Sequence, residues 1–264
     1  MKQYKDYIKN KKEIIAMIHV RALPGTPLNS LDPEVIIKKA IQEAKIYQKH
    51  GIQTVMIENM FDVPYTKKIR PEMVSLMSII GHEIKKLGLY CGIQILAGGN
   101  KEALSAAKAA GLDFIRAEGF VFSHIGDEGF FDSCAGELLR YRRNIKAENV
   151  LIYTDIKKKH SSHAITSDIS IGETAKAAEF FLSDGIIITG DSTGVQPDIK
   201  DLKAVNKMQI TKIIGSGITQ ENLKTYIDLA DMFIVGSYFK TDGQWQNEID
   251  EERVKTFMGE FRGF

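Results

Sequence analysis

The chain has 264 residues, 44% of them hydrophobic, which is enough for a sizeable core in one barrel domain or in two small domains. Its 35 Lys and Arg residues nearly balance its 34 Asp and Glu residues, so no global field favours nucleic acid or a membrane surface as a partner. Its two cysteines lack CxxC spacing and exclude a disulfide scaffold, which suits a cytoplasmic protein. No apolar stretch approaches the length of a membrane-spanning helix, and the lysine-rich residues 1–13 lack a signal-peptide core.

Short β-branched runs alternate with helical patterns along the whole chain. The runs predict eight strands, at residues 14–19, 54–58, 92–96, 114–117, 151–156, 185–189, 212–215 and 232–235. Because each run is followed by a helical pattern, one parallel barrel is favoured over two domains. The sequence therefore predicts an α/β fold, a single (β/α)8 TIM-barrel domain over residues 1–264. Residues 1–12 are expected to lie outside the barrel as an N-terminal extension.

The helical patterns carry start and stop signals. Asp32 is a candidate N-cap with Pro33 in the first helical position, and Gly51 ends that helix. Ser170 and Glu173 have the spacing of a capping box. Two connections are longer than the others, residues 118–135 after the fourth strand and residues 157–169 after the fifth. Long loops in a compact domain tend to be functional, and loops that follow barrel strands lie at the catalytic face.

Polar residues cluster where the predicted strands end. They are His19, Glu58, Asn59, Arg116, Asp155, Thr189 and Asp191. Because the carboxyl ends of barrel strands meet at one face, these residues are candidates for substrate binding or catalysis. We expect Glu58 and Asp155 to act as acid or base, and Asp155 to be half-exposed at the mouth of the barrel.

The fifth strand is followed at once by the basic run Lys157-Lys158-Lys159-His160. Asp155 shares a strand face with Lys157, and a carboxylate beside a lysine or histidine can act as acid or base. We expect Lys159 and His160 to be catalytic together with Asp155 and Glu58, with Asp155 and His160 acting on the same ligand. The alternative is a solvated charge run on a loop. A Schiff base through Lys157 or Lys159 stays open.

Near the end of the chain, two glycine-serine turns each close a short apolar run. The first is Gly215-Ser216-Gly217 and the second is Gly236-Ser237. Small residues let the backbone approach a ligand closely, and amides at a strand-to-helix turn bind an anion without a dedicated cation. The pair matches the phosphate site that the last two βα-loops of a TIM barrel often form. The alternative is two ordinary turns whose glycines serve geometry only.

No dinucleotide fingerprint, P-loop or HExxH motif occurs in the sequence, so no cofactor and no metal are expected. Of the six histidines, only His160 and His163 are close together. Oxygen ligation of a divalent cation by Glu58, Asp155 and Asp191 stays open as a less favoured alternative.

Further motifs accompany these residues from one end of the chain to the other. They are Leu23-Pro24-Gly25-Thr26-Pro27, Asp62-Val63-Pro64, Glu137-Leu138-Leu139-Arg140-Tyr141-Arg142, Thr193-Gly194 and Asp242-Gly243. In this combination the chain resembles the BtpA and SgcQ family, described as photosystem I biogenesis proteins in cyanobacteria and as carbohydrate-cluster proteins in other bacteria. The resemblance implies a TIM barrel grouped with enzymes that bind sugar phosphates, and it brings no established reaction. One departure is Tyr65, where the family tends to have Phe.

The sequence thus predicts a cytosolic enzyme that acts on a small phosphorylated metabolite, either a sugar phosphate or a nucleotide-like compound. Isomerisation, epimerisation, lyase chemistry and glycosidic-bond cleavage all need a positioned acid and base, and these residues do not separate them. The competing class is a non-catalytic assembly or stability factor, which the photosystem association suggests. Whether the chain forms a homo-oligomer stays open.

Overall fold

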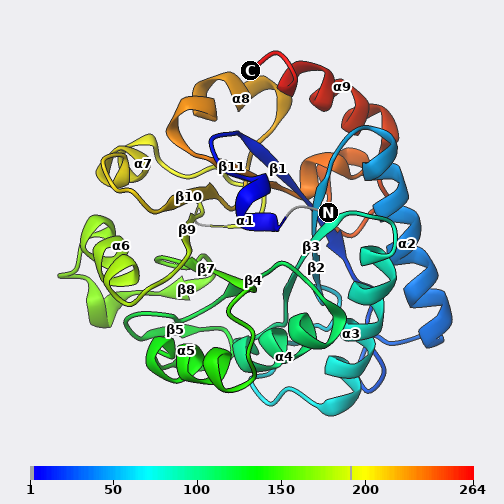
Figure 1. The fold of residues 1–264 in the computed structure, drawn as a ribbon, viewed down its shortest axis with the longest axis horizontal. Coiled ribbons are helices and arrows are strands. Elements are labelled where there is room, and N and C mark those ends of the chain that lie inside the picture. Colours follow the sequence, from blue (N-terminus) through cyan, green and yellow to red (C-terminus); the bar gives the residue numbers. More distant parts are fainter. Residues whose placement is uncertain (1–2, 191) are drawn as a thin grey trace.

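Eight parallel strands form a closed barrel in the computed structural model, which describes residues 3–190 and 192–264 (Figure 1). Around the barrel the strands follow the order β1-β11-β10-β9-β7-β4-β3-β2. Their bounds are β1 Glu13–His19, β2 Thr54–Glu58, β3 Tyr90–Gln94, β4 Phe114–Ala117, β7 Leu151–Asp155, β9 Gly185–Ile188, β10 Thr211–Ile214 and β11 Met232–Val235. The predicted (β/α)8 TIM-barrel fold is confirmed.

A helix follows each barrel strand and packs on the outside of the barrel (Figure 1). These helices are α2 Pro33–Lys49, α3 Pro71–Lys85, α4 Asn100–Ala110, α5 Ala135–Asn144, α6 Ile171–Phe180, α7 Ile199–Val205, α8 Gln220–Tyr226 and α9 Glu251–Phe261. A short helix, α1 Tyr4–Tyr7, precedes β1. The 3-10 helices are η1 Ala164–Thr166, η2 Ile227–Leu229, η3 Ser237–Phe239 and η4 Thr241–Gly243.

The helix starts follow the predicted signals in part. The capping box forms, because Ser170 Oγ accepts the amide of Glu173 at 3.2 Å and the Glu173 carboxylate accepts the amide of Ser170. Asp32 precedes α2, but its side chain makes no capping hydrogen bond. At this helix the fixed backbone of Pro33 therefore provides the start signal.

β3 lies two residues earlier than predicted from the sequence. Beyond Gln94 the chain leaves the ladder, because the amide of Leu96 donates to Asn59 Oδ1 at 2.7 Å. At the other end, Tyr90 pairs with Thr54 of β2 and is buried. The other barrel strands begin and end within one residue of their predicted limits.

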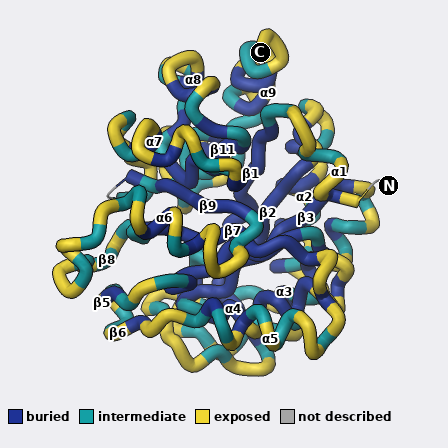
Figure 2. The backbone as a smooth tube through the Cα atoms, turned by 60° about the vertical axis from the view of Figure 1, so that its left-hand side comes forward, coloured by how far each residue is buried: buried dark blue, intermediate teal, exposed yellow. Residues whose placement is uncertain are grey.

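The two faces of each barrel strand contribute to different apolar clusters. On β1, Ile14 and Ile18 pack toward the outer helices, whereas Ile15 and Met17 belong to the cluster inside the barrel. Figure 2 shows the strands as the buried centre of the molecule and the exposed residues on the surrounding helices and loops. The same alternation aims His19, at the end of β1, toward the inside of the barrel.

The N-terminal extension packs against the amino-terminal end of the barrel. Tyr4 is 4% exposed, and its ring centroid lies 5.2 Å from that of Phe114 and 5.1 Å from that of Tyr90. All three rings belong to the inner apolar cluster. Figure 1 shows α1 over the centre of the barrel. The described part of the extension therefore adds no strand but covers this end of the barrel.

The two long loops meet in a small antiparallel sheet of order β6-β5-β8. β5 His124–Gly126 and β6 Gly129–Phe131 come from the loop after β4, and β8 Ser161–Ser162 comes from the loop after β7. The Phe131 ring stacks on the ring of His124 with centroids 4.9 Å apart, and it packs on Leu96 and Ala97 beside the barrel. The sheet thereby fixes both loops at one side of the barrel mouth.

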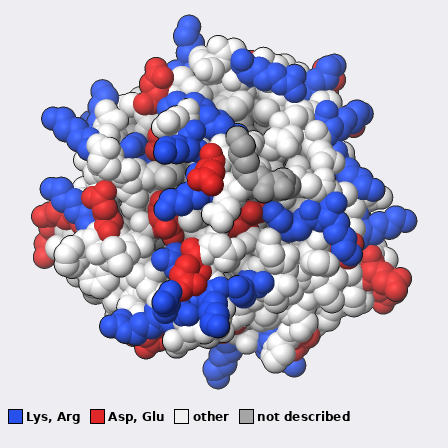
Figure 3. All heavy atoms as spheres, viewed as in Figure 1, with Lys and Arg blue, Asp and Glu red and all other residues white. Residues whose placement is uncertain are grey.

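Figure 3 shows the face that carries α1, on which acidic and basic side chains are interspersed. This distribution matches the nearly balanced composition of the chain. Among the described residues, every helix is too short or too polar to cross a membrane.

Candidate active site

The inward-facing positions of the barrel change from apolar to polar or glycine at the carboxyl ends of the strands. On β1, Met17 belongs to the inner apolar cluster and His19 follows two residues later. Six of the other barrel strands repeat this change by the same alternation, and β9 does not contribute to the cavity. The residues at this level, here called the polar layer, are His19, Glu58, Gln94, Arg116, Asp155, Gly215 and Gly236.

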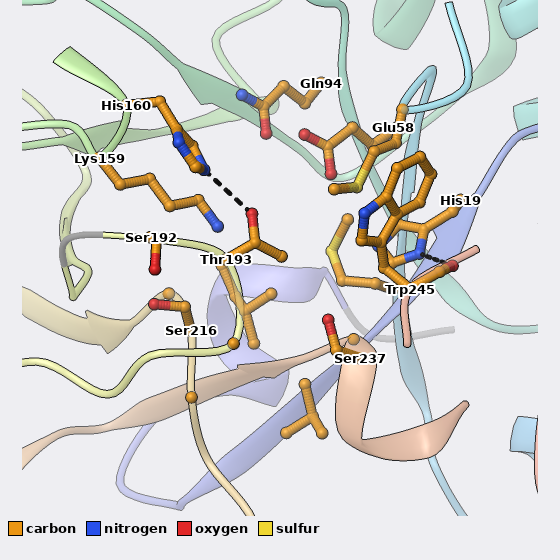
Figure 4. A pocket seen from close by; sticks show the side chains of 18 of the residues that line it. His19, Glu58, Gln94, Lys159, His160, Ser192, Thr193, Ser216, Ser237 and Trp245 are labelled. Carbon is orange, nitrogen blue, oxygen red and sulfur yellow. Dashed lines mark hydrogen bonds between the residues drawn. The ribbon is translucent and has the colours of Figure 1, made fainter. Parts of the chain in front are cut away.

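A cavity of about 820 Å³ opens over the polar layer. Cavities of this size are typical of small-molecule binding sites. Figure 4 shows side chains that converge on it from the strands, from the loop after β7 and from the segment after β11. Among the lining residues are His19, Glu58, Gln94, Arg116, Lys159, His160, Gly215, Ser216, Gly217, Gly236, Ser237 and Trp245.

Glu58 ends β2 and lines the cavity, and among the described residues no donor hydrogen-bonds to its carboxylate. The residue is 9% exposed. Burial raises the pKa of Glu58 above its ordinary value, although the positive charges of Arg116 and Lys159 work in the opposite direction. Glu58 is therefore a buried carboxyl group that is accessible from the cavity and inclined to hold a proton.

Arg116 and Asp155 form a buried ion pair on neighbouring strands. Arg116 Nε lies 3.0 Å from Asp155 Oδ2, and Arg116 Nη2 lies 2.9 Å from Asp155 Oδ1. The Asp155 side chain is 1% exposed, so the expectation of a half-exposed Asp155 is wrong. Asp155 is 6% exposed as a whole and is not among the cavity-lining residues, whereas Arg116 is. The bidentate geometry holds the guanidinium plane in place at the cavity floor.

The three lysines of the basic run take three different positions. Lys157 Nζ donates to the Thr166 carbonyl at 3.4 Å, outside the cavity. Lys158 Nζ pairs with Glu118 Oε1 at 3.1 Å. Lys159 reaches into the cavity, where burial and then the charge of Arg116 lower its pKa to about 8. Lys158 and Lys159 both line the cavity, whereas Lys157, which alternation from Asp155 predicts to face it, does not.

The backbone of this loop is strained. Lys157 has φ 49° and His160 has φ 52°, in the left-handed region that residues other than glycine avoid at a cost of roughly 1–2 kcal/mol each. These two residues bracket Lys158 and Lys159. His160 Nε2 lies 3.1 Å from Thr193 Oγ1, which joins this loop to the one after β9 (Figure 4). His160 thus lines the cavity rim, while Asp155 lies beneath it.

His19 is held neutral beside Trp245. Its Nδ1 lies 3.2 Å from the Trp245 carbonyl oxygen, which can only accept, so Nδ1 carries the proton and Nε2 is left as an acceptor. Burial, and then the charge of Lys240, lower the pKa of His19 to about 3. The Trp245 ring in turn meets the ring of Phe61 edge to face at 4.9 Å. Gly236 leaves room for this imidazole, because a Cβ there would lie 3.3 Å from it.

The two glycine-serine turns present backbone to the cavity. Ser216 Oγ donates to the Val195 carbonyl at 2.8 Å and accepts the amide of Gly190 at 3.2 Å, so this side chain fixes the loop after β9. Gly217 has φ 72°, and a Cβ there would meet the backbone of Gln196 at 2.1 Å. Ser237 begins η3. Within the described residues, the amides of Gly217 and Ser237 have no hydrogen-bond acceptor.

Like Asp155, the predicted site residues Asn59 and Thr189 do not line the cavity. Asn59 donates to Asp62 Oδ2 at 2.8 Å and accepts the amide of Leu96, so it links the loops after β2 and β3. Thr189 lies in a separate depression behind the loop after β9. Asp191 lies outside the described residues. In the described part of the chain, no three His, Cys, Asp or Glu side chains are arranged to hold a metal ion.

Several cavity residues escaped the sequence analysis. Gln94 is 2% exposed, and its Oε1 has no hydrogen-bond partner among the described residues. Strand alternation would have found it, because Gln94 follows Gly92 on the same face of β3. Trp245 comes from the segment between β11 and α9, which lacks a periodic pattern, and Arg253 comes from the start of α9. Arg253 adds a cation to the cavity lining; its Nη1 donates to the Tyr238 carbonyl at 3.2 Å and its Nε pairs with Asp250 Oδ2 at 3.7 Å.

The fold and the cavity define a parallel (β/α)8 barrel whose candidate active site lies at the carboxyl ends of the strands. Known structures with this fold include thiamine phosphate pyrophosphorylase from Pyrococcus furiosus, with a TM-score of 0.59 and 13% identity, covering 97% of this chain and 98% of that one. KGPDC from Streptococcus mutans has a TM-score of 0.60 and 12% identity, covering 96% and 98%. Such low identities establish the fold alone.

The chain belongs to the BtpA family, whose sequence profile matches residues 10–262. The photosystem I biogenesis protein BtpA of Synechocystis is 32% identical over 249 residues, covering 93% of this chain and 86% of that protein. An uncharacterized Caenorhabditis elegans protein, designated mitochondrial, is 49% identical over 253 residues, covering 93% and 91%. The family predicted from the motifs is therefore confirmed.

Proposed function

We propose that this protein is an enzyme that performs acid/base chemistry on a small phosphorylated metabolite at the carboxyl-terminal face of the barrel. The observation that carries the proposal is a pair of groups in one cavity whose pKa values are shifted toward each other. Burial raises the pKa of Glu58, and burial lowers the pKa of Lys159 to about 8. Both groups therefore face the same ligand, with pKa values shifted in the directions that acid/base catalysis at neutral pH requires.

The remaining polar groups supply binding and orientation. Arg116 faces a negative or carbonyl oxygen of the substrate, and Asp155 positions Arg116. Gln94 Oε1 and His19 Nε2 accept from substrate hydroxyl or N–H groups. His160 contacts the same ligand from the rim. Asn59 and Thr189 support the loops around the cavity and do not contact the ligand.

The phosphate binds at the turns that carry Gly217 and Ser237. Ser216, Gly236 and Arg253 line the cavity together with these two turns, so backbone N–H groups and a cation are available to an anion there. A structural neighbour is named for a phosphate ester, thiamine phosphate pyrophosphorylase. We place the protein in the cytosol, in accordance with its two free cysteines.

The proposal is tested by thermal unfolding of the full chain with inorganic phosphate, ribose 5-phosphate and ribose. A ligand that binds only the folded state at a hundred times its Kd adds about 2.7 kcal/mol, which raises Tm by about 5–10 °C in a chain of this size. We expect this rise with both phosphate compounds and not with ribose. A library of phosphorylated metabolites then identifies the substrate class.

The matched variants are Ser237→Asp and Ser237→Asn, which differ by one charge at the same position. Gly217 is a poorer choice, because any side chain there would meet the backbone of Gln196. Ser237→Asp should abolish the phosphate-dependent rise, and Ser237→Asn should keep it. Equal rises in both variants would place the anion elsewhere. If no phosphorylated compound raises Tm, the non-catalytic assembly role suggested by the name of the Synechocystis relative becomes the better reading.

A further inference from the structure

Lys159 differs from its two lysine neighbours in having no hydrogen bond and no close ion pair among the described residues. Lys157 and Lys158 contact the Thr166 carbonyl and the Glu118 carboxylate, respectively. For Lys159 Nζ, no acceptor lies within hydrogen-bonding distance among the described residues. Figure 4 shows its side chain extending into the cavity between His160 and Ser192. An amine without a protein partner at the floor of a ligand cavity is available to react with the ligand.

The backbone on either side of Lys159 adopts a conformation that non-glycine residues disfavour. The left-handed residues Lys157 and His160 lie on either side of the Lys158-Lys159 pair. Strained residues of this kind cluster where a site requires a particular geometry. Here the turn sends Lys158 toward Glu118 and Lys159 into the cavity. Among the described residues Lys159 has no ion pair, so there the loop conformation sets its orientation.

The groups around Lys159 complete the requirements for carbonyl chemistry. Glu58 faces the same cavity with a carboxyl group that is inclined to hold a proton. Arg116 can polarise a carbonyl oxygen, and its charge adds to burial in lowering the pKa of the Lys159 amine. With a pKa of about 8, roughly a tenth of the Lys159 amines are neutral at pH 7, against fewer than one in a thousand for an ordinary lysine.

We propose that Lys159 forms an imine with the carbonyl carbon of an aldehyde or ketone phosphate bound in this cavity. This inference rests on the proposed function and narrows its substrate class to carbonyl-bearing phosphates. It also narrows the reaction to steps that an imine promotes, which are cleavage or formation of the adjacent C–C bond and proton removal from the adjacent carbon.

The covalent step balances within the site. The Lys159 nitrogen lone pair adds to the carbonyl carbon, and the carbonyl oxygen takes up a proton while the nitrogen loses one, which gives a carbinolamine. Glu58 then donates a proton to the hydroxyl group, which leaves as water, and the nitrogen lone pair forms the C=N bond. The resulting protonated imine withdraws electrons from the adjacent carbon. Addition of water reverses the sequence and frees the amine.

The test uses the full chain with glyceraldehyde 3-phosphate and sodium cyanoborohydride, which reduces the imine to a stable secondary amine that peptide mass mapping locates. We expect the adduct on Lys159 at least tenfold above Lys157 and Lys158. The non-phosphorylated glyceraldehyde should label Lys159 at least tenfold more slowly, and inorganic phosphate should compete. The labelling rate should rise with pH to a midpoint near 8. Pyridoxal 5′-phosphate gives a second readout, the absorption band of its imine.

The variants are Lys159→Met, which should lose the adduct, and Lys157→Met, which should keep it. Circular dichroism and Tm show whether both variants are folded. The imine proposal is wrong if either probe labels the surface lysines in proportion to their exposure, without preference for Lys159. If phosphate raises Tm in the parent but Lys159 forms no preferred adduct, Lys159 is a non-covalent anion contact and the proposed function stands. If phosphate has no effect on Tm, the proposed function itself fails.

Discussion

At the residue scale, the two carboxylates proposed from the sequence turn out to have opposite environments. Asp155 makes two hydrogen bonds to Arg116 and is closed off from the cavity, whereas Glu58 has no donor among the described residues and faces the cavity. Both positions end a barrel strand, so the sequence pattern alone does not distinguish them. What separates them is the arginine on the strand next to β7, and strand neighbours follow from the barrel order rather than from local sequence.

Substitution of Asp155 should destabilise the protein more than a surface change would. Asp155→Asn removes one charge from a buried pair and leaves the Arg116 charge without compensation, which costs about 3 kcal/mol. We expect Tm to fall by about 6–12 °C. Glu148→Gln, in the exposed ion pair with Arg143, is the matched control and should leave Tm nearly unchanged. Calorimetry on both variants checks this prediction. Equally small changes in Tm would contradict the stabilising role of the buried pair.

In contrast to substitution of Asp155, substitution of Glu58 should stabilise the protein near neutral pH. Burial raises the pKa of Glu58, so keeping it ionised opposes folding once the pH exceeds that pKa. The penalty is absent below the unfolded-state pKa of about 4.3. Glu58→Gln should therefore have a higher Tm than the parent at pH 8, with the difference shrinking as the pH falls toward 4. The exposed Glu179→Gln is the control. A lower Tm at every pH would mean that attraction to Arg116 and Lys159 outweighs burial.

At the element scale, the antiparallel sheet β6-β5-β8 ties together the two loops that carry His160 and the Asp127–Glu128 turn. Its strands have two or three residues each, too short for hydrophobic periodicity to predict them, although loop length did point to function here. Phe131 anchors the sheet, because its ring packs on Leu96, Ala97 and His124. The sheet should therefore open locally without unfolding the barrel.

Phe131→Ala should loosen this sheet while the barrel stays folded. Loss of a buried ring costs about 3 kcal/mol or more, here concentrated in residues 124–131 and 161–162. Amide hydrogen exchange should accelerate in those segments and stay unchanged in the barrel strands. Phe130→Ala is the matched control on the same strand, because Phe130 is 48% exposed. Faster exchange in β4 and β7 as well would show that the sheet is not an independent unit.

At the scale of the whole molecule, the two ends of the barrel differ in polarity. The amino-terminal end is filled by apolar rings, and the carboxyl-terminal end carries the polar layer and the cavity. The sequence predicted the barrel because eight βα units repeat with clear alternation. It also predicted that Glu58, Lys159 and both glycine turns lie at the barrel mouth, because they stand at or after strand ends. It missed Gln94 through a displaced strand boundary, and Trp245 and Arg253 because tertiary packing alone brings them to the cavity.

Tyr4 provides a test of this division. Tyr4→Ala should remove a buried ring from the amino-terminal end and destabilise the protein by about 3 kcal/mol, lowering Tm by about 6–12 °C. The rise in Tm produced by phosphate should persist, because the ligand binds at the other end. Tyr4→Phe keeps the ring and should stay close to the parent. Loss of the phosphate response in a folded Tyr4→Ala protein would show that the two ends are coupled.

The position of Trp245 has an optical consequence. The chain contains one tryptophan, and it lines the cavity with the rings of His19 and Phe61 against it. All indole emission from this protein therefore originates at the candidate active site. A ligand that enters the cavity will change the polarity around one fluorophore, so its arrival can be followed in the native chain without a label.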